Sequence, residues 1–482
     1  MSRFMTGARK REILNGVKLS MTAKIASMKP VLRRLATAVA LACGLAPLAH
    51  AVPVLPGAIG HGIATPAGRG GAVVRVINLD SSGPGSLKAC VDQRGPRVCV
   101  FEVSGTIRLT DDLTLRNPFI TIAGQTAPSP GITLRGAGLL VKTSDVLVQH
   151  LRVRPGDDAG GEPAGNRDGL KIEGPIDAPI NNVVIDHCTF TWSTDEIASA
   201  WQAWNNISLL NNIFAEPLHD SIHPEGRHGF GVLIGPVNGN ATVAGNLMAS
   251  MESRSPMTAA SRTVIVNNLV YNWGNTAVDL QSRGAVTQNS VVGNVFVRGP
   301  DTSGNSAVVG LRADVATLRP GSKVYLSDNQ APATTADPWS VADAIYGSLR
   351  TADFRSGAPL AWPAGMTTLP TTDNVVRDQV LKFSGARPGD RDSADRRIIE
   401  GVRNGTGRII NCVASDGSSR CNRNGGGWPV LAENHRTLSL PADPNGMTAS
   451  GYTNLELWLQ AMSAQVEGRT SRAPEAPTLT NH

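Results

Sequence analysis

Short segments with apolar residues at alternating positions recur along the chain between residues 147 and 329. Each has three or four apolar-rich residues, a polar residue, an Asn or its substitute, and another apolar pair. The Asn position is occupied in turn, at intervals of 37, 24, 34, 22, 26 and 35 residues, by Leu151, Cys188, Asn212, Asn246, Asn268, Asn294 and Asn329. Period-two strands that recur in this way, with insertions between them, predict the coils of a stacked solenoid.

The Asn positions also predict how the coils are joined. A buried Asn at one place in each coil can hydrogen-bond the coils above and below, and can satisfy backbone groups that a tight bend would leave unpaired. We therefore predict an all-β fold, a right-handed parallel β-helix with an Asn ladder, over residues 52–330. Such a solenoid has a long concave face that suits a polymeric ligand.

The strand pattern fades after residue 330. We predict that residues 331–470 form a partly helical C-terminal extension that packs on the solenoid, in preference to a separately folding module. Helical stretches are expected around 341–349 and 395–403, and the segment GYTNLELWLQAMSAQV predicts an amphipathic helix. Residues 471–482 are expected to be a disordered tail.

The first 51 residues have the features of an export signal. Three basic residues precede the apolar run 35–45, and Ala49-His50-Ala51 has small residues at the two positions that determine cleavage. We expect residues 1–51 to be a signal peptide and leader, with Met21 or Met28 as a preferred start, and the mature protein to be secreted. The apolar run is shorter than the roughly 18 residues of a membrane-spanning helix, so no membrane span is predicted.

The charge of the chain is concentrated in this leader. The whole chain has 45 Lys and Arg against 39 Asp and Glu. Nine of the basic residues and only one acidic residue lie in residues 1–51, which leaves 36 basic and 38 acidic residues in the mature chain. The mature protein is thus nearly neutral, and its charge does not indicate a nucleic-acid partner.

Five cysteines remain after the leader. Cys90 and Cys99 are nine residues apart, as are Cys412 and Cys421, and two local disulfides are expected in an oxidising compartment. Cys188 is left over at an Asn position of the solenoid, where we expect a buried and unreactive thiol.

Several motifs resemble those of a known family. They are HGIATPAGRGG, VINLDSSGPGSLKACVDQRGPRVCVFEVSGTI, ITIAGQTAPSPGITLRGAG, HLRVRPGDD, RDGLKI, VVIDHCTFTWSTDE, RSPM and AENHRTLSLPADPNGMTASGYTNLE. Together they resemble secreted bacterial pectate lyases of the first polysaccharide lyase family, over nearly the whole mature chain. The resemblance implies a right-handed parallel β-helix that cleaves polygalacturonate by calcium-assisted β-elimination.

This reaction needs a metal site. The C5 proton of a 4-linked uronate becomes acidic enough to remove only when the neighbouring carboxylate is neutralised, which Ca²⁺ does as a Lewis acid. By resemblance the ligands are Asp168 and Asp195, which are 27 residues apart, about one coil, and are expected to project side by side. Asn166 and Glu196 are further candidate oxygen donors.

The resemblance assigns proton abstraction to Arg254 in ESRSPM. Because a guanidinium is normally charged, we expect Arg254 to stabilise the carbanion while its transiently neutral fraction or a bound hydroxide takes the proton. A surface salt-bridge arginine is the alternative.

Two residues depart from the family pattern. Ala259 stands where many members have a second Arg, and Arg262 is expected to compensate. Phe230 stands where many have a Lys, and His228 or His223 is expected to contact the substrate instead.

We therefore predict a secreted, monomeric, calcium-dependent pectate lyase whose partner is an acidic polysaccharide, a 1,4-linked galacturonan that it converts to unsaturated oligogalacturonides. The alternatives are a lyase on another uronan or on pectin, and a non-catalytic carbohydrate-binding β-helix. Retention of Asp168 and Asp195 favours an unesterified substrate, because a methyl ester offers calcium no carboxylate.

Overall fold

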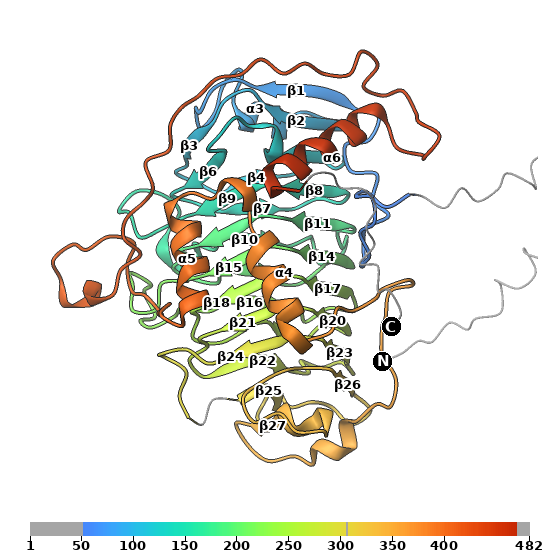
Figure 1. Cartoon of the computed structure of the whole chain (residues 1–482), viewed down its shortest axis with the longest axis vertical. Coiled ribbons are helices and arrows are strands. Elements are labelled where there is room, and N and C mark those ends of the chain that lie inside the picture. Colours follow the sequence, from blue (N-terminus) through green and yellow to red (C-terminus); the bar gives the residue numbers. More distant parts are fainter. Residues whose placement is uncertain (1–51, 305–306, 470–482) are drawn as a thin grey trace, which may run out of the picture. The chain divides into compact units, whose positions relative to one another are not determined.

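The computed structural model describes residues 52–304 and 307–469. The predicted signal peptide and the predicted disordered tail lie outside these ranges. Within them, the chain winds through three sheets whose neighbouring strands all pair in parallel (Figure 1). The structure thus confirms the predicted parallel β-helix.

Each coil from β2 to β25 contributes one strand to each sheet, and β1, β26 and β27 belong to incomplete coils at the two ends. The ten-stranded sheet consists of β1 (Ala72–Val76), β2 (Arg97–Phe101), β5 (Ile120–Ala123), β8 (Val146–Gln149), β11 (Val183–Asp186), β14 (Asn206–Leu210), β17 (Asn240–Ala244), β20 (Arg262–Val266), β23 (Gln288–Val292) and β26 (Lys323–Ser327). The nine-stranded sheet consists of β4 (Leu113–Leu115), β7 (Leu139–Val141), β10 (Leu170–Ile172), β13 (Ala198–Ala200), β16 (Val232–Ile234), β19 (Met257–Thr258), β22 (Thr276–Leu280), β25 (Ala307–Arg312) and β27 (Ala342–Ile345). The eight-stranded sheet consists of β3 (Gly105–Arg108), β6 (Ile132–Arg135), β9 (Leu151–Arg154), β12 (Thr189–Thr191), β15 (Ile213–Ala215), β18 (Leu247–Ala249), β21 (Leu269–Tyr271) and β24 (Val295–Val297).

The predicted Asn ladder is present at the bend between the ten-stranded and eight-stranded sheets. Asn246 is fully buried, and its Oδ1 accepts from the backbone N and the Nδ2 of Asn212, at 2.8 and 3.0 Å. Its own Nδ2 donates to the carbonyl of Leu209 and to Oδ1 of Asn268, both at 2.9 Å. The same contacts continue to Asn329, so the polar groups at each bend are hydrogen-bonded by the Asn of the next coil.

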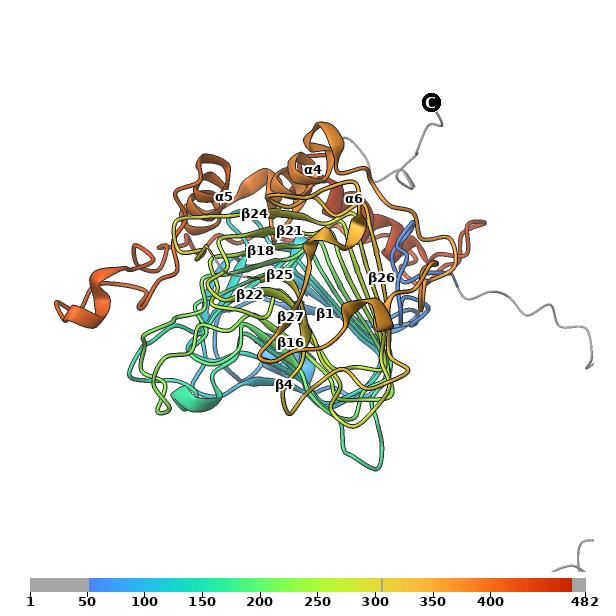
Figure 2. The same ribbon diagram turned by 90° about the horizontal axis from the view of Figure 1, so that it is seen from below.

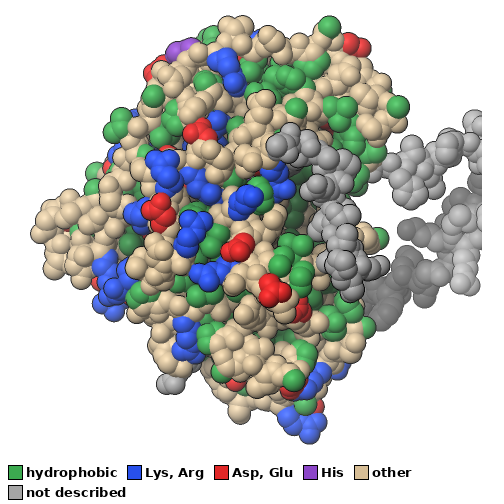
Figure 3. All heavy atoms as spheres, viewed as in Figure 1, with side chains coloured by type: hydrophobic (Ala, Val, Ile, Leu, Met, Phe, Trp, Pro, Cys, Tyr) green, Lys and Arg blue, Asp and Glu red, His purple; other side chains and the backbone are tan. Residues whose placement is uncertain are grey.

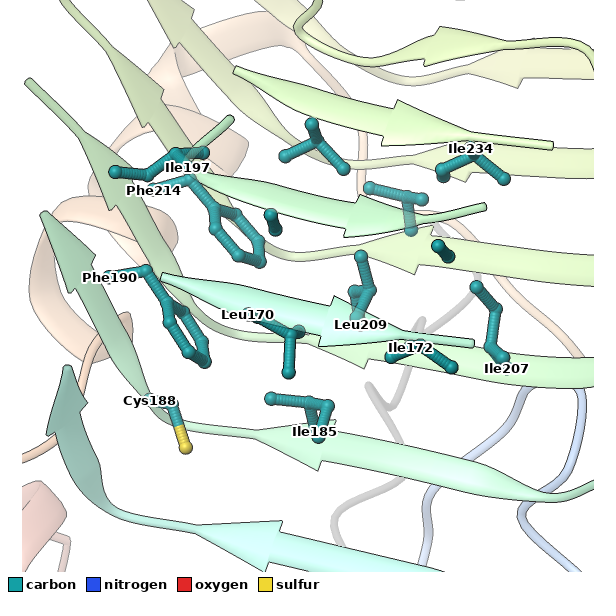
Figure 4. Close-up of a cluster of buried hydrophobic side chains, with 14 of the residues drawn as sticks. Leu170, Ile172, Ile185, Cys188, Phe190, Ile197, Ile207, Leu209, Phe214 and Ile234 are labelled. Carbon is teal, nitrogen blue, oxygen red and sulfur yellow. The ribbon is translucent and has the colours of Figure 1, made fainter. Parts of the chain in front are cut away.

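Aliphatic and aromatic side chains fill the interior of the coils. Figure 4 shows Ile185, Phe190 and Phe214 pointing into it from neighbouring strands, and the two phenylalanine rings stack with centroids 5.4 Å apart. Cys188, at an Asn position of the ladder, is fully buried in the same interior, and burial raises the pKa of its thiol, as expected of an unreactive cysteine.

The solenoid continues beyond residue 330. β27 pairs in parallel with β25, and the turn before it, η3 (Pro338–Val341), packs Trp339 and Val341 into the core. The predictions of a helix around 341–349 and of a β-helix ending at residue 330 were therefore wrong. The free edge of β25 offers backbone hydrogen bonds that outweigh the local helical pattern.

The C-terminal extension contains three helices, α4 (Val375–Phe383), α5 (Ser393–Asn404) and α6 (Asn454–Glu467). Seen down the stack, α4 and α5 lie over β18, β21 and β24 (Figure 2). Basic and acidic side chains are interspersed on this face (Figure 3). α5 begins at the N-cap Asp392 and ends at Gly405 with φ 70°, close to the predicted 395–403. The sequence analysis did not anticipate α4.

Charged groups hold α5 to the solenoid. Arg154 on β9 forms ion pairs with Asp392 and Asp395, both at 2.6 Å, and all three side chains are buried. α6 begins with a capping box between Thr453 and Glu456, and its apolar face packs on the ten-stranded sheet.

Shorter elements complete the described chain. They are α3 (Leu87–Val91), η1 (Gly124–Thr126), η2 (Ala164–Asn166), η4 (Thr351–Phe354), η5 (Thr372–Asn374), η6 (Pro388–Asp390) and η7 (Ser419–Asn422). None of the helices in the described ranges is long and apolar enough to cross a membrane.

The cysteines follow the prediction only in part. The Cys90–Cys99 disulfide is formed and ties α3 to β2. Cys412 and Cys421 are separate buried thiols in this structure, so the predicted second bond is not present, although their Sγ atoms lie within 4.8 Å of each other.

Candidate active site

Three carboxylates converge at one edge of the nine-stranded sheet. β10 and β13 pair with Leu170 beside Ala198, so Asp168 and Glu196, each two residues before its strand, occupy equivalent places on neighbouring coils. Asp195 precedes Glu196, and one oxygen from each of the three residues lies within 4.8 Å of the others. The predicted alignment of Asp168 with Asp195 was therefore one residue out, but both residues reach the cluster.

The electrostatics of this carboxylate cluster favour a bound cation. Burial, followed by the charges of Glu196 and Asp195, raises the pKa of Asp168 well above its usual value. Burial and then Glu196 raise the pKa of Asp195 to about 8. The hydroxyl of Ser199 donates to Asp168 at 2.5 Å, which lowers the pKa of Asp168 and so offsets part of its rise. Because like charges in a partly dry site repel each other, a cation would stabilise the ionised cluster, and oxygen-only donors suit Ca²⁺.

Asn166 does not join the cluster. Its exposed side-chain amide donates to Glu162 at 3.2 Å. Its backbone carbonyl accepts from Nζ of Lys171 at 2.8 Å, and Lys171 also forms an ion pair with Asp112 at 2.5 Å. Asn166 therefore affects the cluster through Lys171, whose charge lowers the pKa of Asp168.

Arg254 lies beside the carboxylates, just before β19. Its guanidinium forms an ion pair with Glu196 and sits over the ring of Phe230, 4.0 Å from the centroid. Phe230, found where the family pattern has a Lys, is thus a platform for the arginine. Arg254 has φ 70°, a conformation uncommon for a non-glycine residue, and such strain clusters at functional sites.

The two candidate histidines, His223 and His228, lie close to Asp195. The rings of His223 and His228 stack with centroids 3.5 Å apart, and their Nε2 atoms are 3.9 and 3.5 Å from Oδ1 of Asp195. Burial, followed by the charge of His223, lowers the pKa of His228. His228 lines the cleft described next and is placed to contact a ligand there.

The cleft has a volume of about 430 Å³ and opens beside Arg254. Its walls include His228, Phe230, Glu252, Arg254, Asp279, Arg312 and Tyr346. Arg262 is not among the residues that line it. The turn after β19 carries the chain to the ten-stranded sheet, where Arg262 begins β20 and donates to Asn240 at 2.5 Å. The prediction that Arg262 replaces a second active-site Arg was wrong for this reason.

Asp279, Arg312 and Tyr346, which line the cleft, were not predicted from the sequence. β22 and β25 were not among the aligned segments, and Tyr346 fell in a predicted helix. The signal that was available is a run of apolar residues ending in a single cation, AVVGLR, two coils beyond Arg254.

Fold and site together define a parallel β-helix with a cleft lined by an arginine that is ion-paired to a cluster of three carboxylates. Comparison with known proteins identifies the relatives of the chain. "Probable pectate lyase C" of Aspergillus flavus is 30% identical over 431 residues, which cover 86% of this chain and 94% of the relative. The protein of the same name from Aspergillus fumigatus, strain Af293, is 30% identical over 442 residues, with coverage of 88% and 97%. The chain belongs to the pectate lyase family.

Solved structures and family models were also compared. A mutant pectate lyase of Bacillus subtilis superposes with a TM-score of 0.47 at 14% identity, covering 72% of this chain and all of that one. Pectate lyase II of Xanthomonas campestris gives 0.42 at 15%, covering 70% and 100%. No family model matches the chain. The expected resemblance to bacterial members in particular is not supported, because the relatives at about 30% identity are fungal.

Proposed function

We propose that the chain is a secreted, calcium-dependent pectate lyase that cleaves 1,4-linked polygalacturonate by β-elimination and releases unsaturated oligogalacturonides. The observation that carries this proposal is the convergence of Asp168, Asp195 and Glu196, with Glu196 ion-paired to Arg254, which lines the cleft. Membership of the pectate lyase family supports it.

The carboxylate cluster is the proposed calcium site. Asp168, Asp195 and Glu196 would hold the ion, and the buried position of Asp168 favours it because the ionised carboxylate is otherwise unstable there. When bound, Ca²⁺ supplies a positive charge that neutralises the uronate carboxylate and makes the C5 proton more acidic.

Arg254 is the proposed catalytic residue. In the reaction the C5–H and C4–O bonds break, a C4–C5 double bond forms, and the leaving oxygen takes up a proton. Glu196 and Phe230 hold the guanidinium beside the cluster, so its charge stabilises the carbanion that develops at C5. The proton leaves to the transiently neutral fraction of Arg254 or to hydroxide.

Secretion and a monomeric state remain expectations of this proposal. The Cys90–Cys99 disulfide supports an oxidising compartment. A lyase acting on another uronan is the alternative, because Phe230 and Ala259 stand where many family members have cations.

The test is the ultraviolet absorbance of polygalacturonate incubated with the mature protein, with calcium and with excess chelator. We expect absorbance from the new double bond to rise only with calcium. Arg254→Lys keeps a positive charge but removes the planar guanidinium and its several donors, and should lower the rate at least about a hundredfold, the usual scale for loss of a transition-state hydrogen-bond donor. Arg350→Lys, at an arginine whose side chain is 81% exposed, should leave it unchanged. Binding of the polymer without absorbance would instead indicate a carbohydrate-binding β-helix.

A further inference from the structure

Three of the described arginines line the cleft, Arg227, Arg254 and Arg312, and Arg312 has no role in the chemistry described above. We propose that Arg312 is a binding residue for a second substrate carboxylate and sets the position of the polymer relative to Arg254. This inference rests on the proposed function, since it assumes a polyuronate in the cleft.

The sheet order places Arg312 along the solenoid axis from the reacting centre. Arg312 ends β25, which is separated from β19 and Arg254 by a single strand, β22. Two strand steps correspond to about 10 Å along the stack. Both arginines line the same cleft, together with Arg227, whose side chain is 73% exposed. The cleft therefore has Arg254 beside the carboxylate cluster and Arg312 farther along the stack.

The guanidinium of Arg312 is held in place before any ligand binds. Nη2 forms an ion pair with Oδ2 of Asp279 at 2.6 Å, and Nη1 one with Asp314 at 3.2 Å. The group lies over the ring of Tyr346, 4.2 Å from the centroid, and Asn275 donates to the Tyr346 hydroxyl at 3.0 Å. A side chain fixed in this way loses little conformational entropy when it binds a carboxylate.

Arg312 also keeps hydrogen-bonding capacity for a ligand. A guanidinium has five N–H donors, and the contacts with Asp279 and Asp314 use one on each terminal nitrogen. The side chain is 17% exposed where it lines the cleft. The remaining terminal donors suit a carboxylate, which arginine binds with paired charge-assisted hydrogen bonds.

Asp279 is the positioning residue for Arg312. It is 3% exposed, and burial raises its pKa while the adjacent Arg312 acts in the opposite direction. Gln281 also donates to Oδ2 of Asp279, at 3.2 Å. A purely structural ion pair needs no aromatic platform on the cleft wall, whereas a ligand-binding arginine gains its orientation from one.

This arrangement accounts for the two departures from the family pattern. The chain has Phe230 and Ala259 where cations are common, so the charge that binds the substrate has moved to another coil. Only a free carboxylate can pair with Arg312, so the residue favours polymer that is unesterified at this place as well as at the reacting sugar.

Arg312→Gln tests the inference, because it removes the charge and keeps a polar side chain of similar length. With saturating calcium, we expect KM for polygalacturonate to rise about tenfold while kcat changes less than about threefold. On partially methyl-esterified pectin, where fewer carboxylates are free to pair with Arg312, KM should differ less between the variant and the wild type. Arg350→Gln, outside the cleft, is the matched control, and thermal unfolding establishes that each variant is folded.

Direct binding separates this inference from the proposed function. Affinity for an oligogalacturonate is measured calorimetrically in the wild type, Arg312→Gln and Arg312→Lys, with the last expected to recover part of the loss. If oligogalacturonate binding depends on Arg312 but no elimination occurs, the proposed lyase activity is refuted and the role of Arg312 in binding stands. Wild-type affinity in Arg312→Gln, or a rise in KM on partially esterified pectin as large as that on polygalacturonate, would refute the binding residue alone. No binding by the wild type would refute both.

Discussion

The affinity of the carboxylate cluster for calcium should depend steeply on pH. Asp195 has a pKa of about 8 in the metal-free protein because of burial and the neighbouring Glu196, and the pKa of Asp168 is raised as well. At the proposed calcium site, the ion would bind the ionised carboxylates and would have to displace any proton on them. Affinity should therefore fall as the pH drops below about 8.

The magnitude follows from the pKa of Asp195. A group with a pKa of about 8 is ionised in roughly one molecule in ten at about pH 7 and in one in a hundred at about pH 6. From that residue alone, the dissociation constant should rise roughly tenfold per pH unit below 8, and protonation of Asp168 makes the dependence steeper. Between about pH 9 and pH 6 we expect a loss of affinity of roughly a hundredfold or more.

Calorimetric titration of the chelator-treated protein with Ca²⁺, without substrate, measures this dependence. Repeating it in two buffers with different ionisation enthalpies counts the protons released. Glu196→Gln should shift the pH dependence to lower pH and weaken binding at high pH, while Asp279→Asn, outside the cluster, should keep the wild-type slope. Equal affinities at about pH 6 and pH 8, with no proton release, would refute the argument.

The same pKa shift has a consequence for stability. The pKa of Asp195 is higher in the folded protein than in the unfolded chain, so the unfolded chain loses its proton first as the pH rises. The metal-free protein should therefore lose stability between about pH 4 and pH 8, and calcium should restore it.

Three further changes test the fold. Asn246→Ala removes four buried hydrogen bonds of the ladder and should lower the free energy of unfolding by roughly 3 kcal/mol or more, measured by denaturant titration. Asp395→Asn leaves Arg154 with less compensating charge and should cost about 3–5 kcal/mol, with early exposure of α5 to hydrogen exchange; unchanged protection there would contradict this. Replacing Cys90 and Cys99 by Ser should cost about 2–3 kcal/mol, and an unaltered thermal midpoint would show that the disulfide contributes nothing.

The prediction of the fold depended on local repetition. Each ladder segment has its apolar residues and its Asn within a few positions, and the ladder contacts in the structure join those same positions from Cys188 to Asn329. The end of the solenoid was missed because β27 has no Asn position and its strand conformation depends on the edge of β25.

The residues of the site also divide into those that local motifs indicate and those that only the stacking of coils brings together. Asp168, Asp195, Glu196 and Arg254 could be proposed because they stand in motifs with a recognisable context, and the structure places them together. Their partners were not, since the contact of Arg254 with Phe230 and that of Arg312 with Asp279 depend on which coils are stacked.

The sequence by itself determined the kind of fold, the ladder, the first disulfide and the residue types of the site, because period-two patterning and short motifs are local properties. The tertiary structure alone decided that Glu196 and not Asp195 is level with Asp168, that Arg262 lies outside the cleft, and that Arg312 lies inside it. The physical reason is register: insertions of variable length separate the strands, so hydrogen bonding between coils, and not spacing along the chain, selects which side chains meet.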